Sequence, residues 1–499
     1  MKSKLIAAVA LILAAAAVFG ASVYQMNMAK NVRAHQHLIA EEKTPCTLDH
    51  TDGTLCTHLP LISIQTGGKT IPGLPNGEED IFGEKEYEMA EDGDSMVTVR
   101  MDVFDSKTEY NHPTDVPTLS TATQIRILGH SSREFGKPPY LLKLRTDEGA
   151  ERDEALLGMK EHNEWALHGP FLDKSLIRNY LFYNLSGEMM DYAPNCRFCE
   201  LLVDGDYRGV YLLVETVTAG EDGRLPIIMK KKNSVLSGYL LRTDRPTEVD
   251  LETLRDVDVY TERTYVQRMD VAIRYPGKGK LTEELKERIE RDFSAFEKAI
   301  YSYDYDSGDY SYDTYIDVDS FVDYYIINAV SSNMDAGRFS TYLYKTIGGK
   351  YKLCVWDFNN CCNNFVDDET AEDFDGVRSA VYFNMLFRDR DFVEKVISRY
   401  RDLRKTVLDE EYLREYIDGT LAFLGDAVAR DSARWAEYIA SDPLIDADQK
   451  GRNPHSQKEA VEMLEENLFS RLNWMDENID YLYQFCANSA NKKYSELPH

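Results

Sequence analysis

The sequence has few basic residues for its length and an excess of acidic ones. Among its 499 residues, 57 are Lys or Arg and 86 are Asp or Glu, so the formal net charge is −29. Proteins that bind nucleic acids present a basic surface to the phosphates, and this composition therefore argues against nucleic acid as a partner. A polyanionic ligand is expected to bind only together with a cation.

Two further patterns are missing. No internal repeat stands out along the chain. The Asp- and Tyr-rich segment 303–320 suggests calcium, but it lacks the spacing of the helix–loop–helix calcium site, which needs Gly at the sixth position of its loop and Glu at the twelfth. We therefore interpret this segment mainly as a loop, with Asp317 or Asp319 capping the helix that follows.

The chain has only eight cysteines, a number that nevertheless suits an oxidising compartment. Cys46 and Cys56 bracket a polar stretch and could close a small disulfide loop. Cys196 and Cys199 have the CxxC spacing, which is compatible with a redox pair, with half of a zinc site or with no special role. A zinc site would need a second pair of ligands, and disulfides are the favoured interpretation.

The N-terminus has the pattern of an export signal. Lys2 and Lys4 precede an almost unbroken apolar run over 5–24, which is long enough to span a bilayer. We predict a signal peptide or signal anchor over 1–25 and a polar spacer over 26–59. The remainder of the chain is then expected outside the cytoplasm, either secreted or anchored by its N-terminal helix.

The remaining chain divides into a strand-rich and a helix-rich part. Short β-branched segments bounded by Gly, Pro, Asn or Asp predict a β-rich part over 60–245, including an antiparallel sheet over 60–145 and a hairpin over 199–214. Helical periodicity dominates 246–499. We therefore expect an α+β protein with two lobes and a cleft between them.

A polar loop flanked by glycine precedes a strand that carries Lys143. Backbone amides and small hydroxyl residues in such a loop can hold a phosphate, and a nearby ammonium can neutralise it. The loop over 129–133 and Lys143 are therefore candidates for phosphate binding, although an exposed strand lysine is also common. Glu215 ends a strand and either faces a nucleotide or is simply solvated.

The stretch from Tyr325 to Asn364 is the strongest candidate for chemistry. An apolar helix is followed by a polar loop with Asp335, then by two strands that turn at Gly348-Gly349, then by Asp357. The outer ends of a hairpin lie together, so the two carboxylates can converge. Phosphoryl transfer needs one carboxylate near the attacking hydroxyl and another on the metal that carries the phosphates.

Several segments, in this order, resemble the CotH kinase family, the spore coat protein H group of secreted and spore-associated bacterial proteins. The resemblance covers roughly residues 58–480. It rests on LPLISIQTGG (59–68), IRILGHSSREFGKPPYLLKL (125–144), DKSLIRNYLFYNLSGEM (173–189), ELLVDGDYRGVYLLVE (200–215), SGYLL (237–241) and the stretch from DVDSFVDYYIINAVSSNMD to KYKLCVWDFN (317–359).

The resemblance implies an atypical protein-kinase-like, bilobal fold and ATP-dependent phosphorylation of proteins with Mg²⁺ or Mn²⁺. By position, Asp335 takes the role of the catalytic aspartate and Asp357 that of the metal-binding aspartate. Lys143 takes the role of the strand lysine that contacts the phosphates. Ser340, five residues after Asp335, is a candidate second contact to the metal.

The resemblance also assigns the nucleotide contacts. They comprise Gly129, Ser131, Ser132 and Arg133 over the phosphates, and Glu215 near the connection between the lobes. The expected substrate is Ser or Thr of a surface or spore-coat protein.

The sequence departs from the family pattern at three places, one of which is Arg242, where the family often has an acidic residue after the SGYLL-type strand. Asn359 stands where the family commonly has a second aspartate in W-D-x-D, so this metal ligand is a neutral amide. His130 stands where the family has Asn, and Leu128 where it has Arg. An inactive kinase-like scaffold that assembles surface layers is therefore the alternative function.

Overall fold

The computed structural model describes residues 33–47, 54–76, 87–129, 131–232, 234–244, 252–253, 270–302, 305, 311–364, 372–380, 382–440 and 453–487. The predicted signal or anchor segment over 1–25 lies outside these ranges, so its prediction stands untested. Within them, the helices are all too short or too polar to cross a bilayer.

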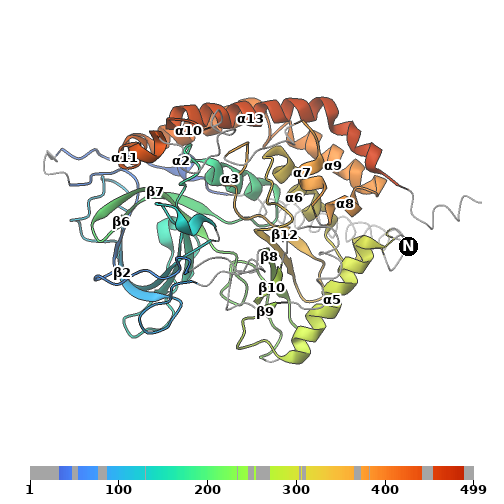
Figure 1. The fold of residues 1–499 in the computed structure, drawn as a ribbon, viewed down its shortest axis with the longest axis horizontal. Helices are drawn as coiled ribbons and strands as arrows, with labels where there is room; N and C mark the ends of the chain where they lie inside the picture. Colours follow the sequence, from blue (N-terminus) through green and yellow to red (C-terminus); the bar gives the residue numbers. More distant parts are fainter. Residues whose placement is uncertain are drawn as a thin grey trace, which may run out of the picture.

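Seven strands of the N-terminal part form a closed barrel, on the left of Figure 1. The strands are β1 (Leu61–Gln65), β2 (Val97–Phe104), β3 (Leu119–Ile127), β4 (Tyr140–Arg145), β5 (Glu164–His168), β6 (Cys196–Val203) and β7 (Asp206–Glu215). Their order is β1-β2-β3-β4-β5-β7-β6, and a parallel pairing of β1 with β6 closes the barrel. Buried and more exposed residues alternate along most of β2, so the side chains on one face of the strand fill the barrel interior.

Strand β6 is buried along its whole length because the barrel interior lies on one face and the helical part on the other. Cys199 packs in the barrel interior, whereas Cys196 packs in the large core beside the helices. Residues three apart on a strand point to opposite faces. The hypotheses that this CxxC pair is a redox pair or half of a zinc site are therefore wrong.

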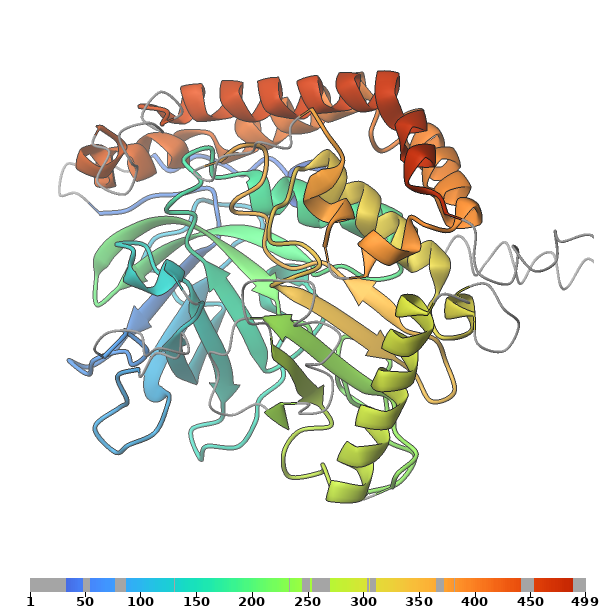
Figure 2. The same cartoon turned by 45° about the vertical axis from the view of Figure 1, so that its right-hand side comes forward.

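A second, five-stranded sheet lies beside the barrel and has the order β12-β11-β8-β10-β9. Its strands are β8 (Tyr239–Asp244), β9 (Glu252–Thr253), β10 (Asp270–Tyr275), β11 (Thr341–Lys345) and β12 (Lys352–Cys354). The central strand β8 pairs antiparallel with both β10 and β11. Helix α5 (Glu283–Tyr301), capped by Thr282, runs along the outer side of this sheet (Figure 2).

The helices form a layer above both sheets (Figures 1 and 2). They are α2 (Gln36–Ile39), α3 (Arg178–Met189), α6 (Val318–Val330), α7 (Asp375–Arg378), α8 (Phe383–Leu386), α9 (Arg390–Leu403), α10 (Glu410–Leu424), α11 (Asp426–Arg434), α12 (Ala436–Ala440) and α13 (Gln457–Asn478). Almost every residue of α3 and α6 is buried, so these two helices form the centre of the large core.

The chain is thus a mixed α+β protein with a β-rich N-terminal part and a helical C-terminal part, as the sequence predicts. Helix α3 begins at Arg178, and Asp173 accepts hydrogen bonds from the backbone N–H groups of Ser175 and Arg178 in the turn before it. Helices α10 and α11 are separated at Gly425, whose φ of 47° is incompatible with a helix.

Candidate functional site

The loop before β11 and the loop after β12 meet at the outer end of the hairpin. The register pairs Tyr342 with Cys354, which places both loops at the same end of the two strands. The side-chain amide of Asn333 donates to the backbone O of Asp357 at 3.0 Å, and that of Asn360 approaches Oδ2 of Asp335 at 3.4 Å. The structure therefore brings together the two loops that carry the predicted acids.

Helix α3 holds the loop that carries Asp357 in place. Asn179 bonds this loop twice: its Oδ1 accepts from the N–H of Phe358 at 2.7 Å, and its Nδ2 donates to Oδ1 of Asn359 at 2.8 Å. The buried hydroxyl of Tyr183 accepts from the N–H of Asp357 at 2.9 Å. One face of α3 thus fixes three consecutive residues of the loop.

Left-handed backbone is concentrated in these two loops. Non-glycine residues with positive φ in the loops are Ser332 (50°), Ser340 (49°), Asp357 (63°), Cys362 (51°) and Asn363 (54°). Such conformations cost free energy and persist where the surroundings impose them. At Asp357 the conformation is supported by Oδ1, which accepts from the N–H of Asn359 at 3.0 Å.

The Asp335 loop is fixed by the buried hydroxyl of Tyr324 in α6. This oxygen accepts from the N–H of Gly337 at 2.9 Å and lies 2.7 Å from Oγ1 of Thr341. The backbone O of Asp335 accepts from the N–H of Phe339 at 2.8 Å. Burial, with a smaller contribution from the charge of Asp335, raises the pKa of Tyr324, so its hydroxyl stays protonated and available for these bonds.

His168, at the end of β5, is a residue of the site that sequence reasoning missed. Its ring packs edge-on against Trp356, with 5.2 Å between the centroids, and Nδ1 lies 3.3 Å from the side-chain nitrogen of Asn179. Burial lowers the pKa of His168 to about 4, so the ring is neutral at neutral pH. Nothing in the sequence of this strand, EWALH, indicates that His168 belongs to the site.

Lys143 lies half-buried on the barrel wall. Its Nζ is 3.6 Å from Oε2 of Glu164 on β5, and Arg274 of β10 approaches the other oxygen of Glu164 at 3.4 Å. Burial opposes the charge of this carboxylate, but Arg274 and then Lys143 outweigh it and lower the pKa of Glu164. The ammonium is thus held by a carboxylate at the junction of the two sheets, and its contact with phosphate stays a prediction.

The loop that was predicted to cover phosphates is tied down by its own arginine. Arg133 is 2% exposed, donates to the backbone O of Gly129 and, at 2.9 Å, to that of Gly73, and stacks on the ring of Tyr87. Gly129 has a φ of 97°, and a Cβ there would lie 2.1 Å from Oγ of Ser132. Arg133 therefore faces inward and supports the loop through the backbone O of Gly129.

The other predicted contacts are placed as follows. Glu215 is buried, not solvated: it accepts from the N–H and the side chain of Asn195, at 3.0 and 3.1 Å, and lies 3.7 Å from Nε of Arg224. Ser340 is half-buried immediately before β11. The side chain of Ser131 lies outside the described residues.

The donor atoms at the two loops suit a hard divalent cation. Asp335 and Asp357 supply carboxylate oxygens, and Asn359 and Asn360 supply amide oxygens, which are the ligands that Mg²⁺ and Mn²⁺ prefer. One lone pair of the Asn359 oxygen already accepts from Asn179. The residues therefore fit such an ion.

No curated protein matches the chain significantly. The family model described as CotH kinase protein matches residues 125–475, which is more than two thirds of the chain. The matched span includes the barrel from β4 onward, the second sheet and both loops of the site. The chain therefore belongs to the CotH kinase family.

Proposed function

We propose that this chain is a CotH-type protein kinase that transfers the γ-phosphoryl group of ATP to Ser or Thr of a surface or spore-coat protein. The observation that carries the proposal is the junction of the Asp335 and Asp357 loops, cross-bonded to each other and fixed by α3. The proposal includes a bilobal, atypical kinase-like arrangement, with ATP between the barrel and the helical part.

In this proposal Asp335 orients the attacking hydroxyl and accepts its proton. Asp357 and the amide oxygens of Asn359 and Asn360 hold Mg²⁺ or Mn²⁺. When bound, the ion neutralises the phosphates as charge develops on them. Lys143 contacts the phosphates from the barrel wall while Glu164 fixes its position. Asn179 is a positioning residue, since it acts through the backbone of the Asp357 loop.

The proposed location is outside the cytoplasm, with the N-terminal segment as signal or anchor. Its basis is the apolar run that follows Lys2 and Lys4. Fractionation of expressing cells, with N-terminal sequencing of the product, distinguishes a cleaved signal from a retained anchor. A protein found only in the cytoplasm would refute this location.

The test is transfer of label from γ-labelled ATP in the presence of Mn²⁺, with mass spectrometry to find the modified residue. Asp335→Asn and Asp357→Ala are expected to lower transfer by at least about 100-fold, as for loss of a group that acts in the transition state. Asn179→Ala should lower it less, about 10-fold, while the fold is kept. Asp222→Asn, an exposed acid outside the site, is the matched control for loss of charge.

An inactive scaffold is the second candidate function, and Asn359 favours it. The amide replaces a charged ligand, and its oxygen is already bonded to Asn179. A scaffold predicts that nucleotide raises the melting temperature of the wild type, or leaves it unchanged, without any label reaching protein. Transfer that disappears in Asp357→Ala but persists in Asp222→Asn would exclude the scaffold.

A further inference from the structure

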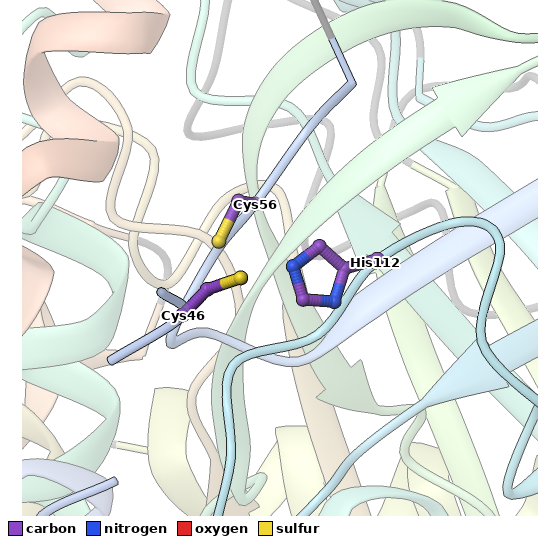
Figure 3. A group of neighbouring side chains, drawn as sticks. All are labelled: Cys46, Cys56 and His112. Atoms are coloured by element: carbon purple, nitrogen blue, oxygen red, sulfur yellow. The ribbon is translucent and has the colours of Figure 1, made fainter. Parts of the chain in front are cut away.

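A cluster of two cysteines and a histidine lies outside the kinase-like site. Ligand atoms of Cys46, Cys56 and His112 all lie within 4.8 Å of one another. Figure 3 shows the two sulfurs side by side and a ring nitrogen of His112 directed at them. In a tetrahedral zinc site, bonds of roughly 2.0–2.3 Å separate neighbouring ligand atoms by roughly 3.5–3.8 Å, so small side-chain movements would complete the geometry.

His112 is oriented by a carboxylate. Its Nδ1 lies 3.1 Å from Oδ2 of Asp115, and the same oxygen accepts from the backbone N–H of His112 at 2.8 Å. Nε2 is therefore the nitrogen directed to the sulfurs. In zinc sites a carboxylate commonly binds the histidine nitrogen that does not bind the metal, where it fixes the ring and raises its basicity.

The backbone around the cluster is already assembled. The N–H of Thr44 donates to the backbone O of Thr108 at 2.8 Å, and Thr57 and Asn111 exchange two backbone hydrogen bonds of 2.7 and 3.1 Å. These bonds join the segment before β1 to the loop between β2 and β3. The three side chains thus occupy a preformed junction, which lowers the entropy cost of binding an ion there.

We propose that Cys46, Cys56 and His112 bind a zinc ion that fastens the segment before β1 to the β2–β3 loop. Thiolate and imidazole are ligands that zinc prefers and that Mg²⁺ and Ca²⁺ do not. Three protein ligands leave the fourth tetrahedral position to water. The site is independent of the proposed phosphoryl transfer, because no residue of either active-site loop belongs to it.

The rival state is a disulfide between Cys46 and Cys56, the interpretation favoured by the sequence and by an oxidising compartment. Zinc-bound thiolates and a disulfide are mutually exclusive, so one measurement separates them. A disulfide needs neither His112 nor Asp115, whereas the zinc site uses both.

The experiment uses the full chain isolated without reductant or chelator. Metal content is measured by plasma mass spectrometry, and cysteines are alkylated under denaturing conditions and identified by mass. We expect about one zinc per chain and alkylation of both Cys46 and Cys56. A Cys46–Cys56 disulfide in a chain without zinc would overturn the proposal.

Variants then test the assignment of ligands. After metal removal, titration with Co²⁺ should give the thiolate charge-transfer absorption in the wild type, and competing Zn²⁺ should abolish it. Cys56→Ser and His112→Ala should weaken Zn²⁺ binding at least about 100-fold. Asp115→Asn, which leaves all three ligands in place, should weaken it about 10–100-fold.

Cys486→Ser, which changes a partly exposed cysteine at the other end of the chain, is the matched control and should bind Zn²⁺ as the wild type does. Equal affinity of Asp115→Asn and Cys486→Ser, or absence of the cobalt–thiolate band, would refute the site.

Discussion

At the scale of single residues, the site depends on polar side chains that are buried beside it. Asn179 contacts three partners, namely the N–H of Phe358, the amide of Asn359 and the ring of His168. Because α3 is buried in the large core, these bonds fix the backbone of the Asp357 loop relative to the helix. Asp357, which is proposed to hold the metal ion, is thus placed by buried neighbours outside its own loop.

His168 should make stability depend on pH. Its pKa is about 4 in the folded chain, whereas the unfolded chain binds the proton near pH 6.5. The stabilisation by the neutral ring is therefore complete above pH 6.5 and is lost as the pH falls towards 4, by about 1.4 kcal/mol per pH unit. In His168→Asn, the loss of stability between pH 7 and pH 5 should be smaller by about 2 kcal/mol. Urea denaturation at both pH values measures it.

The control for this prediction is His455→Asn, because His455 is exposed. Its difference between the two pH values should match that of the wild type. If His168→Asn and the wild type lose the same stability between pH 7 and pH 5, the ring is not held neutral by burial.

Residue types and their order allowed Asp335 and Asp357 to be proposed together, because a hairpin determines where its own ends lie. The same reasoning could not find Asn179 on α3 or His168 on β5, because each lies about 180 to 190 residues from its contacts in the loop. The sequence also could not predict the direction in which a side chain points. Arg133 was expected to face a phosphate, but its guanidinium is buried against Tyr87.

At the scale of elements, helix α11 is fastened to the barrel by a buried ion pair. Oδ1 of Asp431 accepts from Nζ of Lys137 at 2.5 Å and from the N–H of Val210 at 2.7 Å, and Lys137 is 1% exposed. Burial lowers the pKa of Lys137, and Asp431 counteracts this effect. The lysine therefore depends on its partner to remain charged inside the protein.

Asp431→Ala should cost about 3–5 kcal/mol in the free energy of unfolding, because it leaves a buried cation unpaired and an N–H of β7 unsatisfied. The matched control is Asp206→Ala, which removes a surface carboxylate that pairs with Arg434 at 3.2 Å and is 52% exposed. This control should cost less than about 1 kcal/mol. Chemical denaturation measures the free energy of unfolding of both variants. Similar losses of stability in the two variants would show that the α11 contact is not buried as described.

Local patterns predicted the elements whose ends carry turn or capping residues. The hairpin across Asp204-Gly205 and the helix capped by Asp317 are both confirmed. Strand β5 was missed because its sequence, EWALH, contains no β-branched residue, although Gly169-Pro170 follows it directly. The closure of the barrel by the parallel pairing of β1 with β6 also has no local signature, since the two strands are more than 130 residues apart.

At the scale of the whole molecule, the C-terminal helix completes the support of the site. Arg471 of α13 is 6% exposed, and its Nε donates to the backbone O of Ala329 at 2.9 Å, near the end of α6. Its Nη1 donates to the backbone O of Asp373 at 2.6 Å, and the guanidinium lies over the ring of Trp474. The last turn of α6, just before the Asp335 loop, is therefore capped by a residue 142 positions later.

Arg471→Met should lower the free energy of unfolding by about 2–4 kcal/mol, since it keeps much of the side-chain volume but leaves buried carbonyl oxygens without a charged donor. Phosphoryl transfer should fall as well, even at temperatures where the variant is folded, because the loop that follows α6 loses its support.

Arg401→Met is the control for this prediction. Arg401 pairs with Asp480 at the surface, where both side chains are more than half exposed, so its loss should cost less than about 1 kcal/mol and leave transfer unchanged. If Arg471→Met unfolds at the same denaturant concentration as Arg401→Met, the C-terminal helix does not support α6, and the placement of Asp335 must be set by the core around Tyr324 alone.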